Sequence, residues 1–217
     1  MSGFETIRVA TDADGIATLA LDRPDKHHAM DGRMIAELTE AAAALGADPG
    51  VRAVVLASSG PSFCAGGDLG WMRAQAAADR AGKIAEAGRL AAMLAALDAL
   101  PKPLIARVQG DVYGGGVGLI AVSDLAIAAE GVRLALTETR LGLIPATIGP
   151  FLVRRMGAGM ARQVFFSGNA FGTDFALRAG LLHEVCAAGD LRASIAALAD
   201  RWESDEAQQR IRAFLGG

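Results

Sequence analysis

Two glycine-rich turns and one glutamate are the residues of this chain whose types and spacing best suit chemistry. The first turn is Phe63-Cys64-Ala65-Gly66-Gly67-Asp68, and the second is Gly114-Gly115-Gly116. Each turn follows a short apolar run typical of a strand and precedes a helical pattern, so each can direct unpaired backbone N–H groups at one point. Two such donors form an oxyanion hole, and Glu138 can supply the proton-transfer group that an enolate-forming reaction needs.

Simpler interpretations of the same residues compete with this one. A glycine-rich turn often exists only because a residue must adopt positive φ, and an arbitrary glutamate is usually a solvated surface acid. The two turns occur in matching contexts, however, which favours a shared site. Four apolar neighbours also favour burial of Glu138, and burial would raise the pKa of its carboxyl group. These neighbours are Leu134, Leu136, Leu141 and Leu143.

A nucleotide-binding interpretation fits part of the second turn. The segment from Gly116 to Ala121 matches the pattern G-x-G-x-x-A, and Glu138 lies about where a ribose-binding acid would fall. That fingerprint normally opens the first βαβ unit of a domain, whereas these glycines fall in the middle of the chain. We therefore favour the oxyanion hole.

Alternating strand and helix patterns position the two turns. Strands are predicted over residues 7–11, 16–21, 53–57, 104–108, 125–128, 133–136 and 181–185, with an Asp-Gly hairpin joining the first pair. One helix is predicted from the Asp31 cap to the Asp48-Pro49-Gly50 stop. An alanine-rich stretch at 73–83 passes into a second helix that ends near residue 100. Shorter helices are predicted over 117–122, 150–156, 159–166, 175–179, 191–202 and 205–215. A strand-turn-helix unit thus occurs twice, which predicts a layered α/β domain.

Composition and charge narrow the possible functions. The chain has 217 residues, of which 52% are hydrophobic and 5% aromatic, enough for one domain with an aliphatic core. A net charge of −3 with scattered basic residues argues against a nucleic-acid partner. Cys64 and Cys186 lie far apart without metal-ligand spacing, so we expect no metal site, no disulfide framework and a reducing, cytoplasmic compartment. No signal peptide or membrane-spanning run is evident, so we expect no membrane partner.

In their order and combination, these motifs resemble the enoyl-CoA hydratase/isomerase family, which has the crotonase fold. The matching segments are 21–26, 63–69, 102–106, 114–116, 138–145 and 180–182. The resemblance implies a crotonase-like spiral of ββα units as a core over residues 1–185. It also implies a short C-terminal helical segment over residues 186–217, in place of the longer helical region usual in the family.

The resemblance further implies an acyl-CoA substrate and a set of residues that bind it. Coenzyme A would be part of the substrate, and no cofactor would be bound permanently. The backbone N–H groups of Ala65 and Gly115 would hold the thioester oxygen. The residues expected to contact coenzyme A are Lys26, Ala65, Gly66, Gly67, Asp68 and Gly115, with Lys26 on the phosphates. Family members form homo-oligomers, so a trimer or a dimer of trimers is expected.

The catalytic carboxylates depart from the pattern of the best-known hydratases. Those enzymes carry one glutamate two residues after the triple glycine and a second at the place of Glu138, whereas here the first place holds Gly118. A single carboxylate can take a proton from water that attacks C3 and return it to C2, which is hydration by a lyase. It can equally carry a proton between C2 and C4, which is double-bond isomerisation.

The amino-acid sequence around these positions resembles that of a bacterial subgroup associated with methylglutaconyl-CoA and related branched or carboxylated enoyl-CoA esters. The segments that carry this resemblance are 114–120 and 135–146, and the subgroup itself has glycine at the place of Gly118. It implies hydration within fatty acid metabolism, in leucine degradation or acyclic terpene breakdown. Glycine there is expected to free volume for a bulky acyl chain. A catalytically silent acyl-CoA binding protein remains the alternative of another class.

Four further side chains carry minor predictions. His27 and His28 lie in a turn-like stretch and are expected to be exposed rather than catalytic. Cys64 has no histidine partner at recognisable spacing and is expected to be a packing residue. Tyr113, next to the second turn, is equally suited to lining the acyl pocket and to simple packing.

Overall fold

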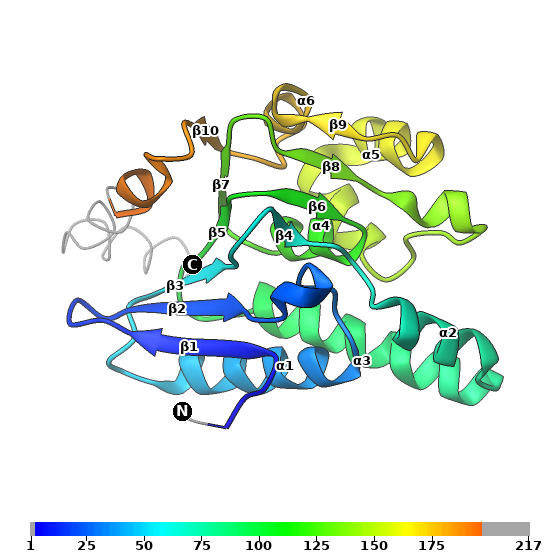
Figure 1. Cartoon of the computed structure of the whole chain (residues 1–217), viewed down its shortest axis with the longest axis horizontal. Coiled ribbons are helices and arrows are strands. Elements are labelled where there is room, and N and C mark those ends of the chain that lie inside the picture. Colours follow the sequence, from blue (N-terminus) through cyan, green and yellow to red (C-terminus); the bar gives the residue numbers. More distant parts are fainter. Residues whose placement is uncertain (1–2, 197–217) are drawn as a thin grey trace, which may run out of the picture.

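This computed structural model describes residues 3–196 of the chain, which form two β-sheets surrounded by helices (Figure 1). The larger sheet has six strands in the order β1-β2-β3-β5-β7-β10. Its strands are β1 Ile7–Thr11, β2 Ile16–Leu21, β3 Ala53–Ala57, β5 Leu104–Val108, β7 Leu125–Ala129 and β10 Glu184–Cys186. The first two pair antiparallel across the predicted hairpin, and every other neighbouring pair is parallel.

The smaller sheet has four strands in the order β4-β6-β8-β9. These are β4 Ser62–Cys64, β6 Asp111–Tyr113, β8 Arg133–Ala135 and β9 Phe171–Gly172. The first three are parallel, and β9 pairs antiparallel with β8. The pairs β3–β4, β5–β6 and β7–β8 each place one strand in each sheet before the chain enters a helical segment. This repetition confirms the predicted spiral of ββα units.

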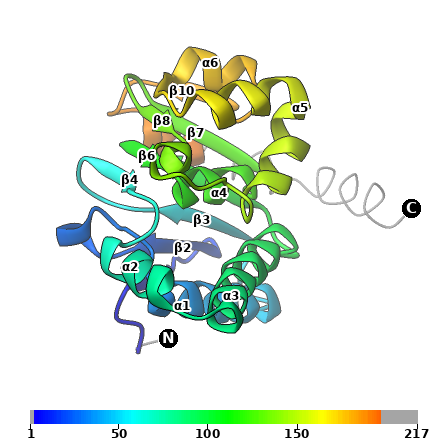
Figure 2. The same ribbon diagram turned by 90° about the vertical axis from the view of Figure 1, so that its right-hand side faces the viewer.

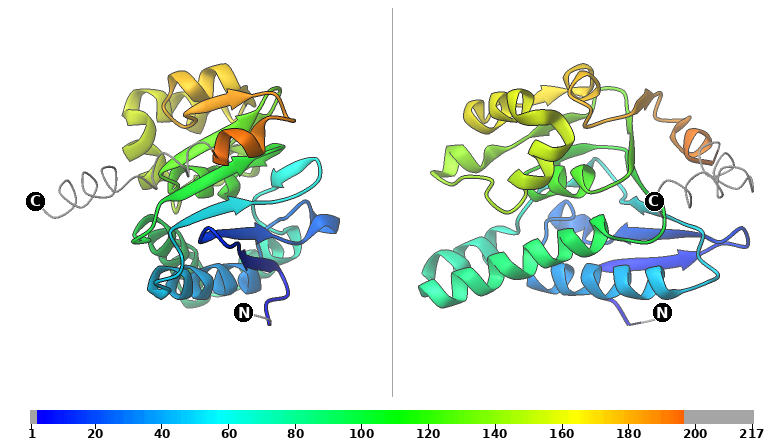
Figure 3. Two further views of the ribbon diagram at one scale, coloured as in Figure 1. Left: turned by 90° about the vertical axis from the view of Figure 1, so that its left-hand side faces the viewer. Right: turned by 180° about the vertical axis from the view of Figure 1, so that it is seen from behind.

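Helices cover the sheets and close each repeat. They are α1 Gly32–Ala47, α2 Leu69–Ala77, α3 Arg80–Asp98, α4 Gly115–Ala121, α5 Gly149–Ser167 and α6 Thr173–Arg178, with 3-10 turns at Pro24–Lys26 and Thr137–Leu141. Figures 2 and 3 show α1 and α3 packed side by side below β2, with α5 and α6 at the opposite end of the molecule. Within the described residues, no helix has the length and apolar character needed to cross a membrane.

Local sequence explains why these elements form where they do. The Asp31 carboxylate accepts a hydrogen bond from the Met34 N–H at 2.9 Å and begins α1, as predicted. Strand β3 is buried at every position, because parallel strands covered on both faces need continuous apolar side chains. Strand β2 alternates between buried and half-buried residues. The core that results is aliphatic, with Phe63 its largest fully buried side chain.

The structure differs from several of the predicted elements. The one helix predicted to follow from the alanine-rich stretch at 73–83 and end near residue 100 is preceded by a second helix, so that α2 and α3 together fill this stretch. Helix α2 buries no residue, so its sequence carries little helical periodicity. The two helices predicted at 150–166 merge into α5 across a kink at Gly157. The last strand lies at 184–186 rather than 181–185, because Leu181 and Leu182 are buried in a turn that bonds back to Ala176.

The predicted C-terminal helices are described only in part. Residues 191–196 are helical, in agreement with the helix predicted over 191–202. The rest of that helix and the one predicted over 205–215 lie outside the described residues.

Candidate active site

The three segments expected to do chemistry follow three adjacent parallel strands. The first glycine turn follows β4, the second follows β6, and Glu138 lies just beyond β8. Because the carboxyl ends of parallel strands meet at one edge of a sheet, the spiral brings these segments together. In Figure 1 these strands point toward the side of the molecule on which α2 lies.

The two glycine turns touch each other. Gly66 has φ +87°, and a β-carbon there would lie 3.0 Å from the carbonyl oxygen of Tyr113 and 3.6 Å from the Cα of Gly114. A side chain at residue 66 would therefore meet both a strained backbone conformation and the second turn. Only glycine lets the two turns approach closely enough to share one site.

Ala65 does not supply the free donor predicted for it. Its N–H donates to the carbonyl oxygen of His27 at 3.0 Å and so is already paired. Gly67 is the alternative donor in this turn, and it lines a pocket between the two turns and helices α2 and α3. Within residues 3–196 no group accepts a hydrogen bond from the Gly67 N–H. We therefore correct the predicted first donor from Ala65 to Gly67.

A single β-bridge orients the Gly67 N–H. Met30 donates its N–H to the Gly66 carbonyl at 2.7 Å and accepts from the Asp68 N–H at 2.8 Å, which is a parallel bridge centred on Gly67. The residue at the centre of such a bridge points its own N–H and C=O away from its partner segment. The Gly67 donor is thus left unpaired at the pocket wall.

Gly115, the predicted second donor, lines the same pocket as Gly67. It is the first residue of α4, where backbone N–H groups have no intrahelical partner. Its neighbour across the wall is Met30, whose Cε would lie 2.3 Å from a β-carbon at residue 115. Met30 therefore contacts both donor segments, one through its backbone and one through its side chain.

Glu138 presents a half-buried carboxyl group to this pocket. Its Oε1 would lie 3.1 Å from a β-carbon at Gly114, which places it beside the second turn. Its Oε2 is buried and has no hydrogen-bond partner within the described residues. Burial raises the pKa of Glu138 above its usual value, as the sequence predicted. Such a carboxyl group is suited to accept a proton and return it.

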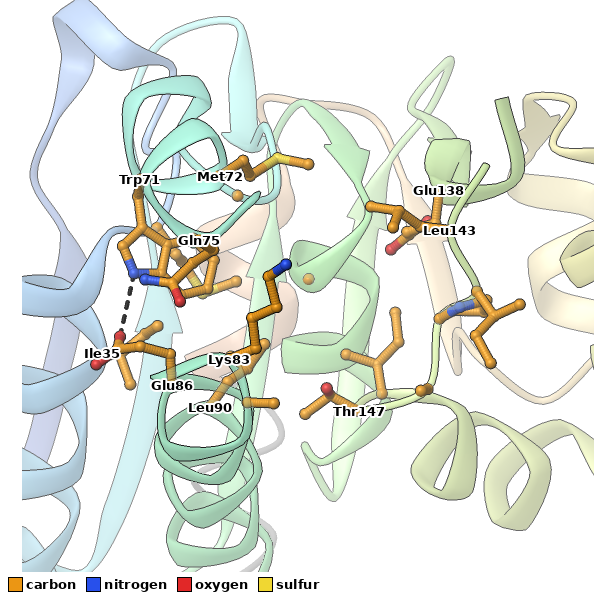
Figure 4. A pocket seen from close by; sticks show the side chains of 18 of the residues that line it. Ile35, Trp71, Met72, Gln75, Lys83, Glu86, Leu90, Glu138, Leu143 and Thr147 are labelled. Carbon is orange, nitrogen blue, oxygen red and sulfur yellow. Dashed lines mark hydrogen bonds between the residues drawn. The ribbon is translucent and has the colours of Figure 1, made fainter. Parts of the chain in front are cut away.

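The pocket is a cavity of about 540 Å³ with mostly apolar walls (Figure 4). Trp71, Met72 and Gln75 of α2 and Lys83, Glu86 and Leu90 of α3 form one wall. Glu138 and the segment 143–148 form the opposite wall. A largely apolar cavity of this size with a few polar groups is typical of a small-molecule site.

The volume expected to be free beside Gly118 is filled. A β-carbon there would lie 2.5 Å from Cγ2 of Ile148 and 3.6 Å from Cδ2 of Leu94. Gly118 is buried and does not line the pocket, whereas Ile148 does. The absence of a second carboxylate is therefore matched by an isoleucine that occupies its place, and the predicted room for a bulky acyl chain at this position is wrong.

Introducing a glutamate at residue 118 is expected to destabilise the fold for this reason. Gly118→Glu should lower the free energy of unfolding by roughly 1–3 kcal/mol, because overpacking a dense core forces backbone shifts. Gly118→Glu combined with Ile148→Ala should recover part of the lost stability. Urea unfolding of the three proteins measures this, and an unchanged midpoint for the single variant would contradict it.

The other predicted residues lie around the site rather than in it. Lys26 is exposed on the 3-10 turn Pro24–Lys26 and does not line the pocket. Asp68 caps α2 by accepting from the Gly70 and Trp71 N–H groups at 2.8 and 3.1 Å. Tyr113 does not line the pocket, and its hydroxyl donates to Asp111 at 3.1 Å.

The two histidines differ from each other. His27 is exposed, as predicted, but the same prediction for His28 is wrong, since its side chain is buried with only 1% of its surface exposed. Its Nδ1 accepts from the Arg23 N–H at 3.1 Å, and its Nε2 lies 2.9 Å from the Ser59 carbonyl oxygen. Cys64 is fully buried, and burial raises its pKa to about 12, which confirms a packing role.

Sequence reasoning missed the polar residues contributed by α2 and α3. Gln75 and Lys83 both line the pocket, and the Oε1 of Gln75 is buried without a partner in the described part of the chain. Both lie in the alanine-rich stretch that showed no periodicity. The available signals were Asp68 and Asp79, which cap α2 and α3 and whose residue type is typical of a helix start.

Comparison with known proteins gives consistent matches. Residues 11–214 match the enoyl-CoA hydratase/isomerase family. An enoyl-CoA hydratase of Alternaria alternata is 32% identical over 184 residues, which are 85% of this chain and 58% of that protein. A crotonyl-CoA hydratase of Syntrophomonas wolfei is 31% identical over 188 residues, 86% of this chain and 71% of that one. This chain thus spans less than two thirds of the Alternaria relative.

A solved structure matches over nearly the whole chain. The crystal structure of an enoyl-CoA hydratase from Shewanella pealeana superposes with a TM-score of 0.92 at 35% identity. The match covers 98% of this chain and 80% of that one.

Proposed function

Because this chain belongs to the enoyl-CoA hydratase/isomerase family, we propose that it binds an enoyl-CoA thioester in this pocket and adds water across the double bond. The observation that carries the proposal is the convergence of the Gly67 N–H, the Gly115 N–H and the Glu138 carboxyl group on one cavity. Coenzyme A enters as part of the substrate.

The proposed reaction uses these three groups in sequence. The thioester oxygen accepts hydrogen bonds from Gly67 and Gly115. Glu138 takes a proton from water as the water oxygen bonds to C3, and the electron pair of the double bond moves into the enolate. The two N–H donors stabilise the enolate oxygen, a contribution of roughly 3 kcal/mol for each donor. Glu138 then returns the proton to C2, so that one water is added and the carboxylate is regenerated.

Turnover in heavy-oxygen water tests this reaction against its alternatives. We expect loss of the enoyl thioester absorbance of crotonyl-CoA and one heavy oxygen in the product. An isomerase uses the same donors and carboxylate but incorporates no oxygen, so 3-butenoyl-CoA converted without label would favour it. Tight binding of butyryl-CoA with no turnover of any enoyl thioester would favour a silent acyl-CoA binding protein.

We also propose that the acyl chain carries a carboxylate. Lys83 extends its ammonium group into the pocket from α3 (Figure 4), and no hydrogen bond or ion pair engages it within residues 3–196. The nearby Glu86 is already engaged by Trp71 at 3.2 Å and by Arg89 at 2.8 Å. Lys83 is therefore available to an anionic acyl group, with Gln75 as a further polar contact.

A carboxylated acyl chain agrees with the resemblance to the methylglutaconyl-CoA subgroup. On that basis we propose that the reaction belongs to fatty acid metabolism, in leucine or acyclic terpene breakdown. The two widely separated cysteines support a reducing, cytoplasmic location. We further propose a homo-oligomer, a trimer or a dimer of trimers. Large apolar side chains that are exposed on the described surface support the oligomer, and they include Leu69, Ile84 and Phe166.

Lys83→Gln is expected to discriminate between acyl groups. The variant should raise KM for glutaconyl-CoA about tenfold, the loss of a charge-assisted hydrogen bond worth about 1.4 kcal/mol, and leave KM for crotonyl-CoA nearly unchanged. Lys102→Gln is the matched control, because Lys102 lies between α3 and β5 and does not line the pocket. Equal changes for both substrates would contradict a carboxylate-binding role.

A further inference from the structure

Arg23 lies beside the two segments, 29–31 and 66–68, that position the Gly67 N–H group. Its side chain is largely buried, with 18% of its surface exposed. The guanidinium Nη1 donates to the Ala29 carbonyl at 2.6 Å and lies 3.1 Å from the Asp31 carboxylate. Its Nη2 donates to the Asp68 carboxylate at 3.3 Å. One side chain thus joins the segment before α1 to the segment before α2.

Both carboxylates that Arg23 contacts are helix caps. Asp31 uses Oδ1 to accept from the Met34 N–H at the start of α1 and presents Oδ2 to Arg23. Asp68 likewise uses Oδ1 for the Gly70 and Trp71 N–H groups and Oδ2 for Arg23. The Trp71 and Gly70 N–H groups and Arg23 together hold the pKa of Asp68 below its usual value. The guanidinium therefore fixes the relative position of two helix starts.

Between those contacts lies the bridge that orients the Gly67 donor. Met30 is flanked by Ala29 and Asp31, both bound to Arg23, and Gly67 directly precedes Asp68. The bridge itself has only two hydrogen bonds, between Met30 and the residues on either side of Gly67. If the segments slid apart or twisted, the Gly67 N–H would lose its direction toward the pocket.

We propose that Arg23 is a positioning residue, whose guanidinium clamps the segments around Met30 and Gly67 so that the Gly67 N–H stays aimed at the thioester oxygen. The inference rests on thioester binding in the proposed function. Arginine suits this role because its planar fork donates in several fixed directions at once, whereas the lysine ammonium acts as a single point charge. Arg23 itself does not line the pocket, so it would act through the backbone of the donor segment.

Steady-state kinetics of Arg23→Gln and Arg23→Lys test the clamp. Removing an oxyanion donor outright costs about 100- to 1,000-fold in kcat. A misdirected donor should cost less, so we expect Arg23→Gln to lower kcat about 10- to 100-fold and to change KM much less. Arg23→Lys, which keeps the charge, should lie between this variant and the parent and remains informative if Arg23→Gln does not fold. Unchanged kcat in folded Arg23→Lys and Arg23→Gln would overturn the proposal.

The infrared band of the thioester carbonyl separates positioning from stability. Butyryl-CoA labelled at the carbonyl carbon cannot be hydrated, and in the parent its band should shift to lower frequency on binding, because both donors polarise the carbonyl. The shift should shrink in both Arg23 variants. Arg8→Gln is the control, since Arg8 pairs with Asp22 on the surface with 79% of its side chain exposed. That variant should keep the full shift.

The outcomes distinguish this inference from the proposed function. A full shift in the Arg23 variants, whatever their melting temperature, would overturn the clamp. No shift in the parent would refute thioester binding at the two donors, and the clamp with it. A shift that is full in the parent and Arg8→Gln but reduced in the Arg23 variants supports both.

Discussion

Glu138→Gln is expected to lower kcat for hydration by at least about 1,000-fold, within the range that general acid–base groups contribute. Glutamine has nearly the same shape as glutamate but cannot accept the proton from water. Residue 118 offers no carboxylate in its place, because it is a glycine packed against Ile148. Glu86 on the opposite wall is engaged by Trp71 and Arg89. The Kd of butyryl-CoA should change by less than about threefold, since the lost interaction is one made in the transition state. Stopped-flow absorbance and calorimetry measure the two quantities.

Glu130→Gln serves as the control for that variant. Glu130 is an exposed glutamate that directly follows β7, away from the pocket lining. Its replacement should leave kcat unchanged. Hydration by Glu138→Gln at the parent rate would show that another group transfers the proton.

The same variant should alter the pH dependence of stability. Burial raises the pKa of Glu138, so the folded protein holds this proton more tightly than the unfolded chain does. The contribution of Glu138 to folding is therefore most favourable below its unfolded pKa of about 4.3, and it is lost as the pH rises through the higher folded pKa. At about pH 8, Glu138→Gln should unfold at a higher urea concentration than the parent, and this advantage should diminish toward about pH 4.

Much of the fold could be predicted because its signals are local. Strands β1, β2, β3 and β5 begin and end at the predicted residues, since each is a short apolar run bounded by turn residues. The burial of Glu138 was equally readable from its leucine neighbours. The spiral then follows from repetition of strand, turn and helix along the chain.

The errors at the site concern contacts between distant segments. In a regular extended segment the N–H groups of residues 65 and 67 would point the same way, but Gly66 between them has φ +87° and interrupts that alternation. Choosing Ala65 or Gly67 as the donor therefore depends on which N–H pairs with another segment. The His27 carbonyl accepts from the Ala65 N–H, whereas Met30 bonds to the residues on either side of Gly67 and leaves the Gly67 N–H unpaired. The spacing of the glycines reveals neither contact. Similarly, the volume beside Gly118 depends on Ile148, which a separate repeat contributes.

Gly66→Ala is expected to lower kcat strongly, because it disturbs the contact between the two glycine turns. The alanine β-carbon would lie 3.0 Å from the Tyr113 carbonyl oxygen, a backbone atom that cannot move without moving the second turn. The variant should also bear backbone strain of about 1–2 kcal/mol, because residue 66 has φ +87°. Since Gly66 accepts the bridge bond from Met30, any shift displaces the neighbouring Gly67 donor. We expect kcat to fall about 100- to 1,000-fold, as for loss of an oxyanion donor.

Gly60→Ala separates the strain from the contact. Gly60 lies between β3 and β4 with φ +70°, close to the value at Gly66, but a β-carbon there meets no atom within 4 Å. Both variants should therefore lose stability of about 1–2 kcal/mol from backbone strain, whereas only Gly66→Ala should lose kcat. Thermal unfolding and hydration assays on the two proteins make the comparison. Equal kcat values would mean that the turns tolerate separation, and the close approach of the two donors would then not be what makes this pocket an oxyanion hole.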